Sequence, residues 1–141
     1  MCSKSQRFSL RKSSKDQVTS AKNMSEQPRD LVKRTIEFAV KVRRFVDLLP
    51  KSITNYEDAK QLGRSSGSVA ANYLEAQEGL SRKDFFYRIK VCRKEARETG
   101  LWLRLINCAA NTDLIDERER LATEADELKR IFSTIAGKDD T

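Results

Sequence analysis

Residues 81–106, SRKDFFYRIKVCRKEARETGLWLRLI, decide the fold. Apolar and small side chains recur through this stretch at alternating spacings of four and three, the pattern of a helix that packs along other helices. The positions of this seam are Phe85, Ile89, Cys92, Ala96, Thr99, Leu103 and Ile106. The stretch therefore predicts a long core helix.

The same helix carries a one-sided run of positive charge. At about 100° per residue, seven cations fall on one flank, roughly 60° to 180° from the seam, whereas Asp84, Glu95 and Glu98 fall on the other. We call the seven the cationic flank: Arg82, Lys83, Lys90, Arg93, Lys94, Arg97 and Arg104. Like charges three and four positions apart destabilise a helix, so a partner is expected.

Two partners could neutralise the cationic flank. Residues 111–141 hold nine acidic against five basic side chains, and could pair with it within the chain or across a subunit contact. Alternatively, Lys and Arg along a helix can follow nucleic-acid phosphates without reading sequence. The pattern alone leaves both open, and we take the seven residues as candidate nucleic-acid ligands.

Trp102 falls at about 260° from the seam, beside Glu95 and Glu98 and away from the predicted core. An amphipathic aromatic residue outside a core seam serves more often in a subunit contact than as a base-stacking platform. We therefore predict that Trp102 contributes to an oligomer contact.

Three further amphipathic segments surround this helix. The first runs from about Asp30 to Leu49 and is ended by Pro50. The second starts near Asn55, which we expect to cap it, continues to about Glu78, and has a small, polar seam. After a break at residues 111–113, the last carries Leu114, Leu121, Leu128 and Ile135 and ends at Gly137. Together they predict an all-α fold, an up-down antiparallel four-helix bundle over residues 29–137 with a frayed end at 138–141.

Residues 1–28 differ from the rest in composition, being rich in Ser, Lys, Arg and Gln without an apolar period. Residues 1–29 hold seven basic against two acidic side chains, so most of the formal net charge of +7 lies there. Three interpretations fit: a disordered basic tail, a targeting segment, or an extension upstream of a translation start at Met24. We favour the disordered tail or the upstream extension.

The composition also bounds the cellular setting. No apolar run approaches the roughly 18 residues of a membrane span, and none suits a signal peptide, so a cytoplasmic protein is expected. The chain has three cysteines and no CxxC pair, which favours reduced thiols. We place Cys92 and Cys108 on one helix, about 24 Å apart and beyond disulfide reach, with Cys92 in the core.

The sequence lacks the residues that most enzymes use. It contains no histidine, Gly-rich phosphate loop or GxSxG motif, which argues against an enzyme. Glu75, Glu78, Glu95 and Glu98 could be imagined as metal clamps, but with basic residues interleaved they are expected to pair with arginine or lie in solvent. No catalytic residue, metal or cofactor is predicted.

Four short motifs carry a family resemblance: RSS at 64–66, ANYLEA at 71–76, SRKDF at 81–85 and KEARET at 94–99. With them, residues 30–106 resemble the bacterial four-helix-bundle family named for proteins encoded in intervening sequences of large-subunit rRNA genes. That family includes the accessory variability determinant of diversity-generating retroelements. Residues 1–28 have no counterpart in it.

The resemblance implies an up-down bundle that assembles as a homo-oligomer, a ring of five with a basic channel or surface. For the retroelement relatives it also implies binding to a reverse transcriptase and to nucleic acid, whereas most other members have no established function. We accordingly expect a non-enzymatic, oligomeric nucleic-acid-binding accessory protein. The alternative is an assembly adaptor whose cationic flank pairs with an acidic partner or a neighbouring subunit.

Overall fold

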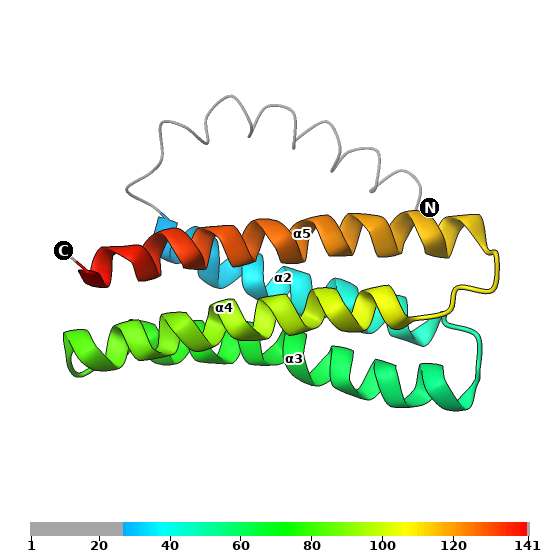
Figure 1. Ribbon diagram of the computed structural model, residues 1–141, viewed down its shortest axis with the longest axis horizontal. Coiled ribbons are helices and arrows are strands. Elements are labelled where there is room, and N and C mark those ends of the chain that lie inside the picture. The colour runs from blue at the N-terminus through cyan, green and yellow to red at the C-terminus, as the bar shows by residue number, and fades with distance from the viewer. Residues whose placement is uncertain (1–26, 141) are drawn as a thin grey trace, which may run out of the picture. The chain divides into compact units, whose positions relative to one another are not determined.

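The computed structural model describes residues 27–140, and residues 1–26, including Met24 and the predicted basic tail, lie outside the described part. Four long helices account for most of it: α2 (Gln27–Asp47), α3 (Ile53–Gln77), α4 (Arg82–Leu105) and α5 (Thr112–Gly137). Over residues 31–140 consecutive helices run antiparallel, each turning back at a short connection (Figure 1). The predicted up-down four-helix bundle is confirmed.

Each helix after α2 begins at a polar cap. The side chains of Ser52, Ser81 and Asn111 accept hydrogen bonds from backbone N–H groups three residues on, at Asn55, Asp84 and Leu114. Such caps satisfy donors that the first helical turn leaves free. The expected cap at Asn55 is wrong, because α3 starts two residues earlier and Ser52 fills that role.

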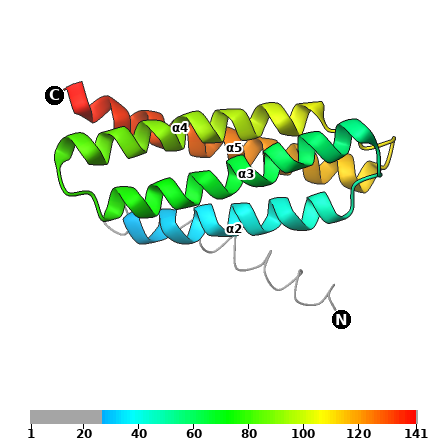
Figure 2. The ribbon, with the colours of Figure 1, turned by 90° about the horizontal axis from the view of Figure 1, so that it is seen from below.

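The core lies along the predicted seams. On α4 every seam residue is buried except Phe85, which is partly buried while its neighbour Phe86 is buried instead. The view in Figure 2 shows α3 and α4 running side by side, with α2 below α3. The α3 seam contains small and polar residues as expected, and the larger side chains of Leu62, Val69 and Tyr73 are also buried on this helix. The Tyr73 ring lies 5.7 Å from that of Phe132 on α5.

The connection between α4 and α5 departs from the prediction of one continuous helix through Cys108. Helix α4 ends at Leu105, and Cys108 is buried in the turn. Ala109 and Ala110 both adopt positive φ, at 51° and 61°, a conformation that reverses the chain within a few residues. Asn55 holds this connection against the start of α3: its side chain donates to the Asn107 carbonyl at 2.8 Å and accepts from the Asn107 N–H at 2.9 Å.

A short 3₁₀ helix, η2 (Lys138–Asp140), follows α5, and the frayed end expected at 138–141 stays a prediction. Two residues of the cationic flank hold η2: Lys90 Nζ lies 3.0 Å from Asp139 Oδ2, and Arg82 donates to the Lys138 carbonyl at 3.0 Å. None of the helices in the described part of the chain is long and apolar enough to cross a membrane.

Candidate nucleic-acid interface

The seven residues of the cationic flank divide into two groups along α4. Arg82 and Lys90, near its start, contact η2, and the Arg82 guanidinium also lies 4.8 Å from the centre of the Phe86 ring. These two cations therefore interact with the C-terminal part of the chain, which is the first of the two partners considered from sequence.

The remaining five cations of the flank have no such partner. Among residues 31–139, whose side chains the structure describes, no carboxylate oxygen lies within 4.0 Å of the side-chain nitrogens of these cations, whereas other ion pairs such as Arg34–Glu124 and Lys90–Asp139 meet that distance. All are exposed except Arg93, which is partly buried. The five are Lys83, Arg93, Lys94, Arg97 and Arg104.

Three of these cations share one hollow. Lys94, Arg97 and Arg104 line a depression of about 550 Å³ between α4 and α5, together with Lys129 from α5. We call it the Gly100 hollow, after the glycine in its lining. Lys129 could not be included from sequence, because a helical wheel describes one helix and cannot show which residue of another helix faces it. Gly100 could have been noticed, since a glycine inside a helix is unfavourable.

A buried polar cluster joins α3 to the opposite side of α4. Arg64 Nη1 lies 2.9 Å from Glu95 Oε2, and the Thr99 hydroxyl donates to Ser65 Oγ at 2.9 Å. The expected pairing of Glu95 with an arginine is confirmed, although its burial was not foreseen. Two motifs behind the family resemblance, RSS at 64–66 and KEARET at 94–99, thus meet in this cluster.

The cluster sets the charge of two carboxyl groups. Although burial opposes ionisation of Glu95, hydrogen bonds with Glu98, Ser68 and Arg64 lower its pKa. The hydrogen bond with Glu95, together with burial, raises the pKa of Glu98. Glu98 is therefore the member of the pair that tends to hold a proton.

Trp102 lies on the same side of α4 and is closer to the core than predicted. It is partly buried and packs against the hydrophobic core, and its Nε1 is buried without a hydrogen-bond partner among the described residues. A helical wheel places a side chain by angle alone and does not show how far an indole reaches toward a neighbouring helix. Its assignment to an oligomer contact stays a prediction.

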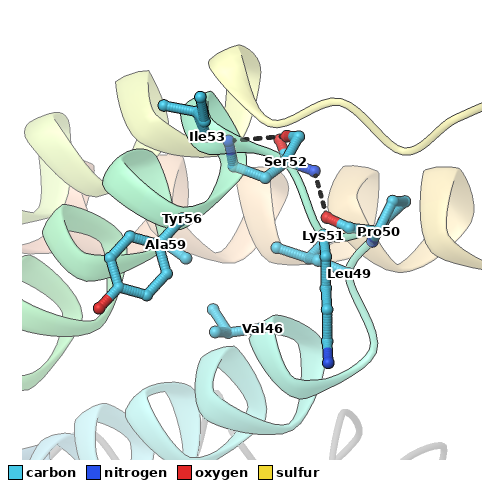
Figure 3. A pocket seen from close by; sticks show the side chains of 9 residues that line it. Val46, Leu49, Pro50, Lys51, Ser52, Ile53, Tyr56 and Ala59 are labelled. Carbon is cyan, nitrogen blue, oxygen red and sulfur yellow. Dashed lines mark hydrogen bonds between the residues drawn. The ribbon is translucent and has the colours of Figure 1, made fainter.

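A second, apolar hollow of about 680 Å³ lies where α2 turns into α3. Its walls come from the end of α2, the connecting loop and the first turns of α3, and the side chains around it include Val46, Leu49, Ile53 and Tyr56 (Figure 3). Ile53 is 85% exposed and Tyr56 66%. Large apolar side chains so exposed are typical of protein contact surfaces.

No metal site accompanies these surfaces. Among the side chains that the structure describes, those of residues 31–139, no three of His, Cys, Asp or Glu lie close enough together to hold a metal ion. The free thiols of Cys92 and Cys108 are both buried, and burial raises the pKa of Cys92 to about 12.

Comparison with known proteins places this geometry in a family. The model of the 23S rRNA-intervening sequence protein family matches residues 28–134. The chain belongs to this family. The match confirms the resemblance drawn from the four motifs.

One solved structure similar to the chain comes from Bacteroides thetaiotaomicron and is described as a protein with unknown function from the S23 ribosomal protein family. The two are 28% identical with a TM-score of 0.66, and the match covers 78% of this chain and 97% of that one. A comparison with curated proteins gave no match. Neither family description assigns a biochemical activity, so function has to be argued from the surfaces themselves.

Proposed function

We propose that this family member is a non-enzymatic, homo-oligomeric helical bundle of the cytoplasm that binds nucleic acid without sequence preference. The observation that carries the proposal is the set of five cations on α4 with no carboxylate oxygen within 4.0 Å among residues 31–139. Unpaired Lys and Arg side chains aligned on one helix suit the regular negative charge of a phosphate backbone. The missing histidine supports a binding role over catalysis.

The resemblance to ring-forming relatives supports an assembly of five subunits. Such a ring would repeat the α4 surface around one axis, and the positive electrostatic potentials of the five copies would add. The retroelement relatives extend the proposal to a reverse transcriptase as partner. Both extensions rest on resemblance, whereas nucleic-acid binding rests on the surface of this chain.

Salt dependence tests the proposal directly. Fluorescence anisotropy with a labelled DNA duplex between 50 and 200 mM salt should give a log–log slope of about 0.9 for each phosphate contacted. Replacing Arg97 and Arg104 together by glutamine should reduce that slope by about 2 if each contacts one phosphate. Charge reversal of Arg93 and Arg97 to glutamate should weaken binding further.

A matched control removes the same charge elsewhere. Lys41 and Arg44 are exposed on α2, which contacts α5 through Arg34 and Glu124 and α3 through Arg43 and Gly63. Their double glutamine variant should leave the slope near that of the wild type. Affinity that does not change with salt, or that falls equally in both double variants, would refute binding through α4.

An assembly adaptor is the second candidate, and the apolar hollow beside Ile53 and Tyr56 favours it. In that case the cationic flank pairs with an acidic partner or a neighbouring subunit, as Lys90 already does with Asp139. The Arg97 and Arg104 variant should then break the assembly in size-exclusion light scattering. The wild type should also leave nucleic acid unbound at moderate salt.

A further inference from the structure

Gly100 occupies an unfavourable place for its residue type. It lies inside α4, where glycine is less favourable than any ordinary residue except proline. A Cβ atom added at Gly100 would meet no atom within 4 Å, apart from its own helix backbone and chain neighbours. By contrast, a Cβ at Gly67 would lie 3.0 Å from Arg43 Nη2. Packing within the described chain therefore gives no reason for glycine at position 100.

The surroundings of Gly100 are cationic and spacious. Arg97 and Arg104 precede and follow it at three and four positions, so on a helix they flank it on the same face. Small residues, Ala122 and Ala125 of α5, line the same hollow. The missing Cβ thus leaves open space in a hollow that Arg97 and Arg104 also line. Neither arginine has a carboxylate oxygen within 4.0 Å among residues 31–139, whose side chains the structure describes.

The two carboxyl groups that also line the hollow are compensated by their neighbours. Asp126 lies 3.3 Å from Lys129 Nζ and 3.0 Å from Arg130 Nη2. The hydrogen bond of Glu98 to Glu95 raises the pKa of Glu98. Four cations, Lys94, Arg97, Arg104 and Lys129, line the Gly100 hollow against these two carboxyl groups, so the charge of its walls is positive.

We infer that the Gly100 hollow seats a phosphate group of a nucleic-acid backbone, flanked by Arg97 and Arg104, with glycine leaving room for close approach. This assignment rests on the proposed nucleic-acid binding and gives it a defined contact point. A phosphate matches the forked donors of arginine in a bidentate geometry. Further cations along α4, at Lys83 and Lys94, suit an extended polyanion better than a single carboxylate.

Two glycine-to-alanine variants of the full chain test the assignment. Gly63 on α3 is a matched control, because a Cβ there also meets nothing within 4 Å and the residue does not line the hollow. Both variants should melt at or above the wild-type temperature, since alanine favours a helix. Only Gly100→Ala should weaken binding of a DNA duplex, by about tenfold or about 1.4 kcal/mol. Gly100→Gln, which fills more of the hollow, should weaken it further.

Inorganic pyrophosphate serves as a small probe of the same hollow. In an amide-correlation NMR titration, the largest shifts are expected at Gly100 and Leu101 and should be lost in Gly100→Gln. Shifts centred elsewhere, or equal DNA affinity in both alanine variants, would overturn the assignment while leaving nucleic-acid binding intact. If polyglutamate bound as tightly as DNA of equal charge, the ligand of the hollow would be an acidic protein surface and the assignment to a nucleic-acid phosphate would be wrong. A wild-type chain that binds no nucleic acid would overturn the proposed function and, with it, this assignment.

Discussion

The carboxyl pair Glu95 and Glu98 gives a stability prediction whose sign depends on pH. Glu95 is only 5% exposed and bonded to Arg64, and its pKa lies below the ordinary 4.5. The pKa of Glu98 lies above 4.5, because its hydrogen bond to Glu95 requires a proton. Glu98 Oε2 is buried without a partner among the described residues, so an ionised Glu98 is poorly accommodated.

Glu98→Gln should therefore stabilise the fold at neutral pH. A carboxyl group with a raised folded-state pKa contributes its full stability below the unfolded pKa, and this is lost as the pH rises through the folded value. The glutamine amide can donate to Glu95 at every pH. A hydrogen bond to a charged group contributes about 1.5–3 kcal/mol. Because Glu98 is only partly buried, we expect a gain of about 1 kcal/mol at pH 7.5 and almost none at pH 4.

Urea unfolding followed by far-ultraviolet circular dichroism at both pH values measures this gain. In a thermal melt, about 1 kcal/mol corresponds to roughly 4 °C for a domain of this size. Glu75→Gln, at an exposed position of α3, is the control and should change the free energy of unfolding by less than about 0.5 kcal/mol. A destabilised Glu98→Gln protein at pH 7.5, or an equal gain at both pH values, would refute the proton-sharing geometry.

Two further predictions concern buried groups. Asn55→Ala should lower the free energy of unfolding by about 2–4 kcal/mol, because it removes three hydrogen bonds that link the two connections at one end of the bundle. Urea titration measures the loss, and an equal effect of Thr54→Ala at the exposed neighbouring position would count against it. Cys92, whose pKa burial raises to about 12, should stay unalkylated by iodoacetamide at pH 8.5 until the chain unfolds. Peptide mass spectrometry would show this, and rapid labelling of the folded protein would contradict it.

Sequence periodicity predicted the bundle because each seam is a local property of one helix. Ile89, Leu103, Leu121 and Leu128 were all assigned to apolar seams from spacing alone, and all are buried. Caps at Ser81 and Asn111 were predictable for the same reason, since a cap bonds three residues away.

The failures involve partners that lie far apart in the sequence. Asn55 was expected to cap its own helix, but its main partner is 52 residues away. Trp102 was placed outside the core because one helical wheel contains no information about the helix beside it. Likewise, the Gly100 hollow needs Lys129 from α5, whose position depends on how two helices pack. The cationic flank was recognised, but its division into paired and unpaired cations depends on the fold of η2.

The polar cluster between α3 and α4 also specifies the alignment of these two helices. A seam of similar small and apolar residues can slide by one helical turn, about 5.4 Å, and still bury comparable area. The Ser65–Thr99 and Arg64–Glu95 pairs form in a single register, because a slipped arrangement would separate the two hydroxyl groups and leave the buried Glu95 carboxylate without its arginine. We therefore regard these polar residues as selecting one register of α3 against α4 among several that would bury a similar apolar area.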